Sequence, residues 1–213
     1  NNIESLNEKT FSNLFPKLIE INLHNNKIRE IEKNSFKNLP SLHYLVLSNN
    51  QLESNTHGFD SLTIFKWFNI TYNNLKSIKS FFFNNSKKIH LIDLSHNSIN
   101  QIEPNGFYSL ENELKFLNLS YNLFLSIKSY YFNNLYGLNY LNLANNKISS
   151  IEEDSFLKLK FLTILDLSDN CLFKLDLKLF SNTINLDELI LKNNLIKSMN
   201  QNLFLKLNKL RIL

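Results

Sequence analysis

Two histidines and an aspartate lie close together near the middle of the chain. His90, Asp93 and His96 share one extended segment and its exit, and imidazole nitrogens and carboxylate oxygens are ligands that zinc accepts. The spacing matches no recognised ligand motif, and solvated polar side chains on a strand explain it better. We therefore expect no bound metal and no cofactor.

The remaining reactive side chains do not favour an enzyme. The single cysteine, Cys171, follows Asn170 at a turn position, and we expect a free thiol there. Three glycines cannot supply a phosphate-binding loop as well as the turns. The net charge of +4 is modest, and the lysines are scattered over loops, which argues against a nucleic acid ligand. We expect no catalytic residues.

The composition indicates repetition. Leucine supplies 41 and asparagine 37 of the 213 residues, whereas glycine and proline supply three each, which is far from average globular usage. The length is that of one domain. No apolar run approaches twenty residues, so we expect no membrane-spanning helix and no direct membrane contact in this stretch.

The sequence repeats with a period of 23 to 25 residues, so that leucine and asparagine recur at the same positions of each repeat. We call each such set of equivalent positions a column. We predict one solenoid over 1–213, with a partial repeat at 1–17, eight full repeats at 18–209 and a partial repeat at 210–213. Each full repeat carries an asparagine after its L-x-L segment and a phenylalanine in its second half. The asparagine column is Asn26, Asn50, Asn73, Asn97, Asn122, Asn146, Asn170 and Asn194.

Each L-x-L segment predicts one short strand. Its two leucines point to one side and the intervening residue to the other. Strands of successive repeats should lie side by side in parallel, so that their leucines and isoleucines form one continuous core. The asparagine amide can satisfy backbone groups at the turn after the strand. The phenylalanine column should fill the outer side of the core.

This repeat resembles the 24-residue extracellular class of the leucine-rich-repeat family, found in Toll-like receptors, small proteoglycans and neuronal adhesion receptors. The asparagine and phenylalanine columns carry the resemblance over essentially the whole chain. It implies an α/β-type repeat solenoid: a horseshoe with a parallel β-sheet on the concave face and loops or short helical turns on the convex face. Both ends fall inside a repeat without Cys-rich caps, so we interpret the chain as a fragment of a longer protein.

The outward-facing strand positions are the candidates for ligand binding. The residue before the second leucine of each strand is large and apolar in six adjacent repeats, and exposed aromatic patches often mark interaction sites. The next outward column is largely polar. Codon bias that inflates aromatic residues and asparagine everywhere is the alternative explanation. We expect ligand-binding residues at Tyr44, Trp67, Asn69, Asp93, Phe116, Asn118, Tyr140 and Asn142.

Two further surfaces are candidates for contacts. Acidic residues gather at the C-terminal end of the predicted concave face and would suit a basic partner surface; they are Asp166, Asp169, Asp187 and Glu188. Aromatic pairs precede two members of the phenylalanine column and form a candidate homodimer contact, unless they fold back onto the core. The pairs are Phe81 with Phe82 and Tyr130 with Tyr131.

Three N-glycosylation sequons begin at Asn69, Asn84 and Asn118. Those at Asn69 and Asn118 arise from the repeat pattern itself. Asn84 follows the phenylalanine column in an outward loop and is the expected acceptor. A glycan on Asn69 would lie beside Trp67 and would count against ligand binding there.

Two functional hypotheses remain. In the first, the chain belongs to the ectodomain of a cell-surface receptor or adhesion protein and recognises a protein ligand or co-receptor on its concave face. In the alternative, it is a cytoplasmic scaffold that assembles protein partners, where one free cysteine is normal. The repeat class and the sequons favour the extracellular hypothesis.

Overall fold

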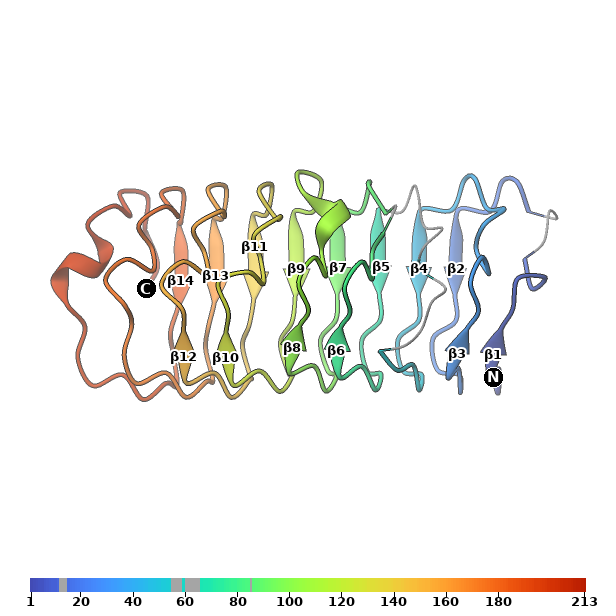
Figure 1. The fold of residues 1–213 in the computed structure, drawn as a ribbon, viewed down its shortest axis with the longest axis horizontal. Coiled ribbons are helices and arrows are strands. Elements are labelled where there is room, and N and C mark those ends of the chain that lie inside the picture. Colours follow the sequence, from blue (N-terminus) through green and yellow to red (C-terminus); the bar gives the residue numbers. More distant parts are fainter. Residues whose placement is uncertain (12–14, 55–58, 60–65, 85) are drawn as a thin grey trace.

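One row of short parallel strands runs the length of the molecule (Figure 1). The computed structural model describes residues 1–11, 15–54, 59, 66–84 and 86–213. Within these residues the main sheet has eight strands in the order β14-β13-β11-β9-β7-β5-β4-β2. The strands are β2 (Glu20–Asn22), β4 (Tyr44–Val46), β5 (Trp67–Asn69), β7 (Leu91–Asp93), β9 (Phe116–Asn118), β11 (Tyr140–Asn142), β13 (Ile164–Asp166) and β14 (Glu188–Ile190).

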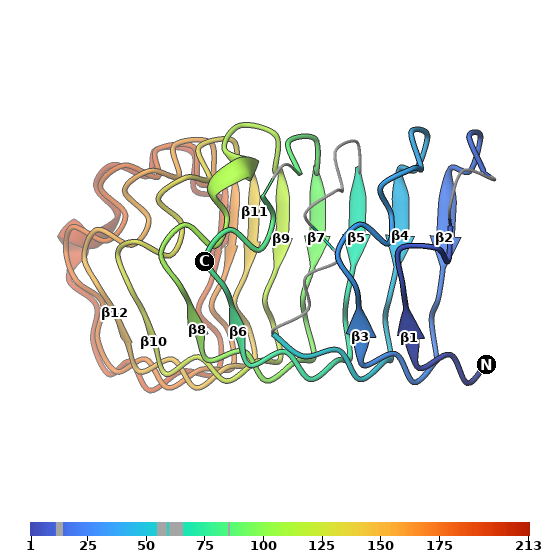
Figure 2. The ribbon, with the colours of Figure 1, turned by 45° about the vertical axis from the view of Figure 1, so that its right-hand side comes forward.

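Shorter elements lie away from the main sheet. Three two-stranded parallel sheets pair β1 (Ser5–Leu6) with β3 (Glu30–Ile31), β6 (Ser77–Ile78) with β8 (Gln101–Ile102), and β10 (Ser126–Ile127) with β12 (Ser150–Ile151). Two 3-10 turns, η2 (Tyr108–Leu110) and η3 (Gln201–Phe204), are the helical elements of the described part. The stack of turns curves along its length (Figure 2). The predicted horseshoe with its sheet on the concave face is confirmed.

The strand register is the one that the leucine pattern predicts. Leu117 pairs with Ile92 on one side and with Leu141 on the other, and all three side chains are fully buried. Their strand neighbours are half-buried and face the opposite side. Because side chains alternate along a strand, burial of the central column leaves the flanking columns on the open face.

A buried asparagine amide joins each turn of the solenoid to the preceding one. Asn122 Nδ2 donates to the carbonyl of Leu94 at 3.0 Å and to those of Leu119 and Ser120 at 3.1 and 3.2 Å, while its Oδ1 accepts from the Ile99 amide at 2.9 Å. The same pattern recurs in the asparagine column from Asn50 to Asn194. The amide thus satisfies backbone groups that the turn removes from water.

The phenylalanine column forms the outer wall of the core. Phe132, Phe156 and Phe180 are at most 1% exposed and stack with centroid separations of 6.2 and 6.5 Å. Phe204 continues the stack beyond Phe180 at 6.5 Å. The outer side of the core is therefore filled by aromatic rings at the spacing of the turns.

Removal of one amide tests the importance of these cross-turn bonds. We expect Asn122→Ala to lower the free energy of unfolding by about 3 kcal/mol, because buried carbonyls and an amide N–H lose their partner. Urea denaturation followed by circular dichroism measures the difference.

The matched control is Asn133→Ala, which removes an exposed asparagine whose side chain makes no hydrogen bond with another described residue. We expect a change within about 0.5 kcal/mol. Equal losses in the two variants would contradict a structural role for the buried amide.

Candidate functional site

An uninterrupted apolar row crosses the open face of the main sheet. Its members occupy the first position of six neighbouring strands, are half-buried and pair in register. We call this the concave row. It consists of Tyr44, Trp67, Leu91, Phe116, Tyr140 and Ile164.

Trp67 carries an unsatisfied hydrogen-bond donor in this row. Its ring packs edge-on against Tyr44, with centroids 6.4 Å apart. Its Nε1 is shielded from solvent and has no acceptor in the described part of the chain. A buried donor without a partner is costly, and because this atom is closed to solvent, the exposed part of the Trp67 ring is what a ligand can contact.

Phe116 and Tyr140 form a second, parallel pair of rings. Their centroids are 4.3 Å apart and their planes differ by 2°. Asn142 Nδ2 donates to the Tyr140 hydroxyl at 3.3 Å. Burial raises the pKa of Tyr140 above its ordinary value. The two rings are held in one orientation before any ligand arrives.

The polar row lies beside the concave row and consists of Asn69, Asp93, Asn118 and Asn142. Its side chains stabilise the turns that follow the strands. Asn118 Oδ1 accepts from the amide and the hydroxyl of Ser120 at 3.1 and 2.8 Å, and Asp93 Oδ1 accepts from the same groups of Ser95 at 3.0 and 2.7 Å. Asn69 and Asn142 also accept from a backbone amide two residues on. One side-chain oxygen of each residue therefore closes the turn after its strand, which limits the hydrogen bonds left for a ligand.

These turns also account for two of the sequons. Thr71 and Ser120 donate their hydroxyl groups to Asn69 and Asn118, and both hydroxyl residues are buried. The repeat therefore selects a hydroxyl two residues after the asparagine for the turn itself. Asn84 is exposed in an outer turn, and the central residue of its sequon, Asn85, lies outside the described residues.

Sequence reasoning missed a stack of three rings at the strand exit. Tyr72, His96 and Tyr121 stack with centroid separations of 4.1 and 4.2 Å and nearly parallel planes. Tyr72 is 55% and Tyr121 49% exposed. All three have φ of 53°, in the left-handed region.

The other members of this strand-exit column are asparagine or aspartate. They have φ between 52° and 56°, a conformation that suits Asn and Asp better than aromatic residues. The turn conformation therefore does not explain three adjacent aromatic residues. Their departure from asparagine and aspartate is visible in the sequence and could have indicated the stack. The asparagine and aspartate members are Asn25, Asn49, Asn145, Asp169 and Asn193.

The candidate metal ligands have separate partners. His90 Nε2 lies 3.4 Å from Glu113, Asp93 accepts from Ser95, and His96 lies within the ring stack. Among the described residues no group of three His, Cys, Asp or Glu side chains is placed to hold a metal ion. Cys171 is exposed and free.

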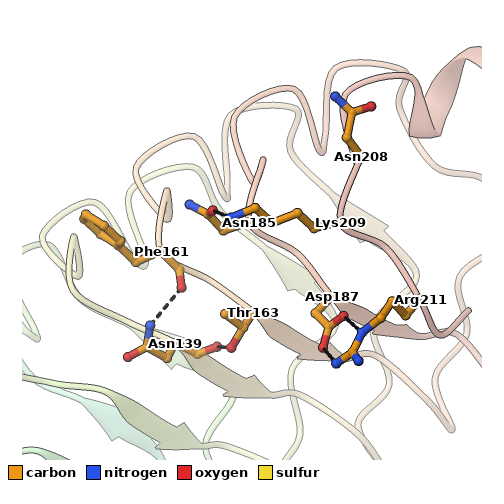
Figure 3. A pocket seen from close by; sticks show the side chains of 8 residues that line it. All are labelled: Asn139, Phe161, Thr163, Asn185, Asp187, Asn208, Lys209 and Arg211. Carbon is orange, nitrogen blue, oxygen red and sulfur yellow. Dashed lines mark hydrogen bonds and ion pairs between the residues drawn. The ribbon is translucent and has the colours of Figure 1, made fainter.

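The acidic C-terminal end is partly neutralised. Arg211 donates from Nε and Nη2 to the Asp187 carboxylate at 2.5 and 2.6 Å (Figure 3). These bonds hold the pKa of Asp187 below its ordinary value. Asp169 accepts from Asn193 at 2.8 Å, on the strand-exit edge. The acidic surface is therefore smaller than the sequence suggested.

The outer aromatic pairs are divided between core and surface. Phe82 and Tyr131 are 7% and 6% exposed and belong to the core. Phe81 and Tyr130 are exposed, and Phe81 packs edge-on against Tyr108 at 5.7 Å. Only the first member of each pair is available for the predicted homodimer contact.

A curved stack of parallel strands joined by buried amides defines a repeat protein of the solenoid class. The sequence profile described as Leucine rich repeat matches residues 1–52, 65–124 and 112–172, more than half of the chain. The chain belongs to the leucine-rich-repeat family. Within the described residues, no helix has the length and apolar character needed to cross a membrane.

Two known proteins match the chain over part of their own length. Lumican of Coturnix japonica is 34% identical over 93 residues, which are 42% of this chain and 26% of lumican. The leucine-rich repeat domain of APL1B is 27% identical, with a TM-score of 0.79, and the match covers 100% of this chain and 58% of that domain. The matched part of the chain thus spans 26% of the length of lumican. It spans 58% of the APL1B domain.

Two further solved structures share the fold. Toll of Drosophila, in a complex with Spatzle, is 21% identical with a TM-score of 0.71, covering 91% of this chain and 31% of Toll. TLR13, in a complex with ssRNA13, is 24% identical with a TM-score of 0.67, covering 99% of this chain and 38% of TLR13. At these identities the similarity concerns the fold alone.

Adjacent residues on opposite faces of one strand test the assignment of the concave row. We expect Phe116→Ala to lower the free energy of unfolding by about 1 kcal/mol, the contribution of a half-exposed ring stack. Leu117→Ala should cost about 3 kcal/mol, because it leaves a cavity in the core. Urea denaturation of both variants provides the comparison, and a reversed order would show that Phe116 belongs to the core.

A substitution at the strand exit tests the strain in the ring stack. We expect Tyr121→Asn to change the free energy of unfolding by less than about 1 kcal/mol, because the relieved strain offsets the lost stacking. Tyr121→Ala is the control and should be the less stable variant, since alanine lacks both the ring and the tolerance for positive φ. Equal stability of the two variants in thermal denaturation would contradict this account.

Proposed function

We propose that the chain is a protein-binding segment of an extracellular receptor or adhesion protein, and that its ligand or co-receptor contacts the concave row. The observation that supports this proposal is the uninterrupted row of half-buried apolar side chains on the open face of the sheet. Rigid aromatic side chains with one polar group are favoured anchors in protein interfaces.

The individual contacts give each anchor a role. The half-buried Trp67 ring packs edge-on against Tyr44 and offers apolar surface to the ligand. Phe116 and Tyr140 offer a flat, preorganised surface, which lowers the entropy lost on binding. Asn69, Asp93, Asn118 and Asn142 contribute the hydrogen-bonding groups that remain beyond their turns.

The strand-exit stack widens the proposed contact surface. Tyr72, His96 and Tyr121 each lie three residues beyond the polar row, in three adjacent turns of the solenoid. Their rings are already ordered by stacking, and aromatic side chains of this kind bury large areas at low entropic cost. A ligand on the concave row would reach this edge.

The relatives support a binding role and leave the ligand open. The Toll structure is a complex with a protein, Spatzle, whereas the TLR13 structure is a complex with RNA. We propose a protein ligand here because the concave row is apolar. We also propose that the chain is not an enzyme and that Asn84, which is exposed, carries a glycan. The homodimer through Phe81 and Tyr130 stays a prediction.

A binding screen tests the role of the concave row. The protein is screened against an array of secreted and cell-surface proteins, and each interaction is measured again with Trp67→Ser and Phe116→Ser. We expect at least about tenfold weaker binding in both variants, because anchors at the centre of an interface dominate its affinity.

The matched control is Phe173→Ser, which removes an exposed ring outside the row. Its affinity should equal that of the unchanged protein. Unchanged binding in the Trp67 and Phe116 variants, or equal weakening in all three variants, would contradict a specific role of the concave row.

Expression in secretory cells tests the location. We expect surface display of the full-length protein and a glycan mass that disappears in Asn84→Gln, since Asn84 is the exposed sequon asparagine. Asn118→Gln should keep the glycan mass. An unmodified cytosolic product would favour the intracellular scaffold instead.

A further inference from the structure

Two shallow depressions lie on the edge of the solenoid where the chain enters the last strands. They have volumes of about 700 and 400 Å³ and share Phe161 as a common wall. In the larger one, Phe161 stands at one end and Arg211 at the other (Figure 3). We call the two depressions together the entry-edge groove. It lies apart from Trp67 and Phe116.

The entry-edge groove is basic. Lys158 and Lys160 line the smaller depression, and Lys209 and Arg211 line the larger one. One carboxylate, Asp187, is among the lining residues, and Arg211 holds it in two hydrogen bonds. Lys158 and Lys160 form no ion pair with another described residue. The groove therefore has an excess of positive charge that its own residues do not neutralise.

Side-chain amides brace the backbone around the groove. Asn139 Nδ2 donates to the Phe161 carbonyl at 2.9 Å, and Asn185 Nδ2 donates to the Lys160 carbonyl at 2.7 Å. Lys209 Nζ in turn donates to Asn185 Oδ1 at 2.6 Å. Four successive turns are thus joined at this edge. The unused donors of the groove are mainly N–H groups of cationic side chains, which select a ligand rich in acceptors.

Phe161 provides an apolar platform between the charged groups. Its side chain is 59% exposed, and the described rings include no stacking partner for it. The negative face of an aromatic ring attracts the C–H groups of a flat ligand. The groove thus combines two exposed aromatic side chains, Phe161 and Tyr136, with cations beside them.

We infer that the entry-edge groove binds an acidic polysaccharide, with one sugar stacked on Phe161 and its sulfate or carboxylate groups on Lys158, Lys160 and Lys209. Open depressions stay hydrated and lack the dry centre that anchors a protein partner. Polynucleotides need a series of platforms for successive bases, whereas the described lining residues of the groove include two aromatic side chains, Phe161 and Tyr136. A linear polymer with spaced anionic groups fits lysines that lie two repeats apart, with Lys158 and Lys160 on one turn and Lys209 on the other.

Titration with polysaccharides tests this inference. Heparin and neutral dextran are titrated into the purified protein at several salt concentrations and followed by calorimetry. We expect heparin to bind, with an affinity that falls as salt rises, and dextran not to bind. Phe161→Ser should weaken heparin binding about tenfold with an unchanged salt slope, and Lys160→Gln with Lys209→Gln should weaken it similarly with a reduced slope.

The matched control removes two positive charges elsewhere. Lys27→Gln with Lys147→Gln changes exposed lysines that follow Asn26 and Asn146, and it should leave heparin affinity within about twofold. An equal loss in this control would overturn the proposal, because binding would then depend on net charge alone. Absence of heparin binding at physiological salt would also overturn it.

Two further probes separate the ligand classes. Oligodeoxythymidylate and polyglutamate are negatively charged polymers, but neither is a polysaccharide. We expect both to bind more weakly than heparin. Tighter binding of either probe, lost in Phe161→Ser, would assign the groove to a nucleic acid or an acidic protein segment instead. Because Phe161 is largely exposed, its substitution leaves the fold intact, which circular dichroism verifies.

Discussion

The structure depends on a hydrogen-bonding requirement that recurs at every turn. A chain that leaves a strand and enters the core removes backbone amides and carbonyls from water, and these groups must find partners. Asn122 meets this requirement with one side chain that bonds to its own turn and to the preceding one. Since the partner lies in another repeat, no turn is complete alone, and stacking of neighbours is a condition of folding.

The arrangement of side chains on the open face follows from the hydrogen bonding in the core. The buried amides fix the register of the turns, and the register places Phe116 beside Tyr140 and Tyr44 beside Trp67. The ring contacts on the concave row are therefore consequences of a repeat length kept near 24 residues. Insertion of one residue within a strand segment would move its outward side chains into the core.

Much of the fold could be predicted because its determinants are local. The leucine spacing gave the strand positions, and the asparagine column gave the turns. Contacts between variable positions were harder. The ion pair of Asp187 with Arg211 joins residues 24 apart, and neither position has a fixed type in the repeat. The burial of Phe82 and Tyr131 depends on the shape of the core behind them, which periodicity does not describe. The ring stack around His96 was missed because its column looked like an ordinary turn position.

The parallel pairing of the main sheet also has a mechanical consequence. Backbone hydrogen bonds between neighbouring strands point along the axis of the solenoid, from one turn to the next. A pull on the two ends of the stack would load these bonds one row at a time instead of shearing many together. The molecule would respond as a soft spring whose coils separate singly and close again in the same order.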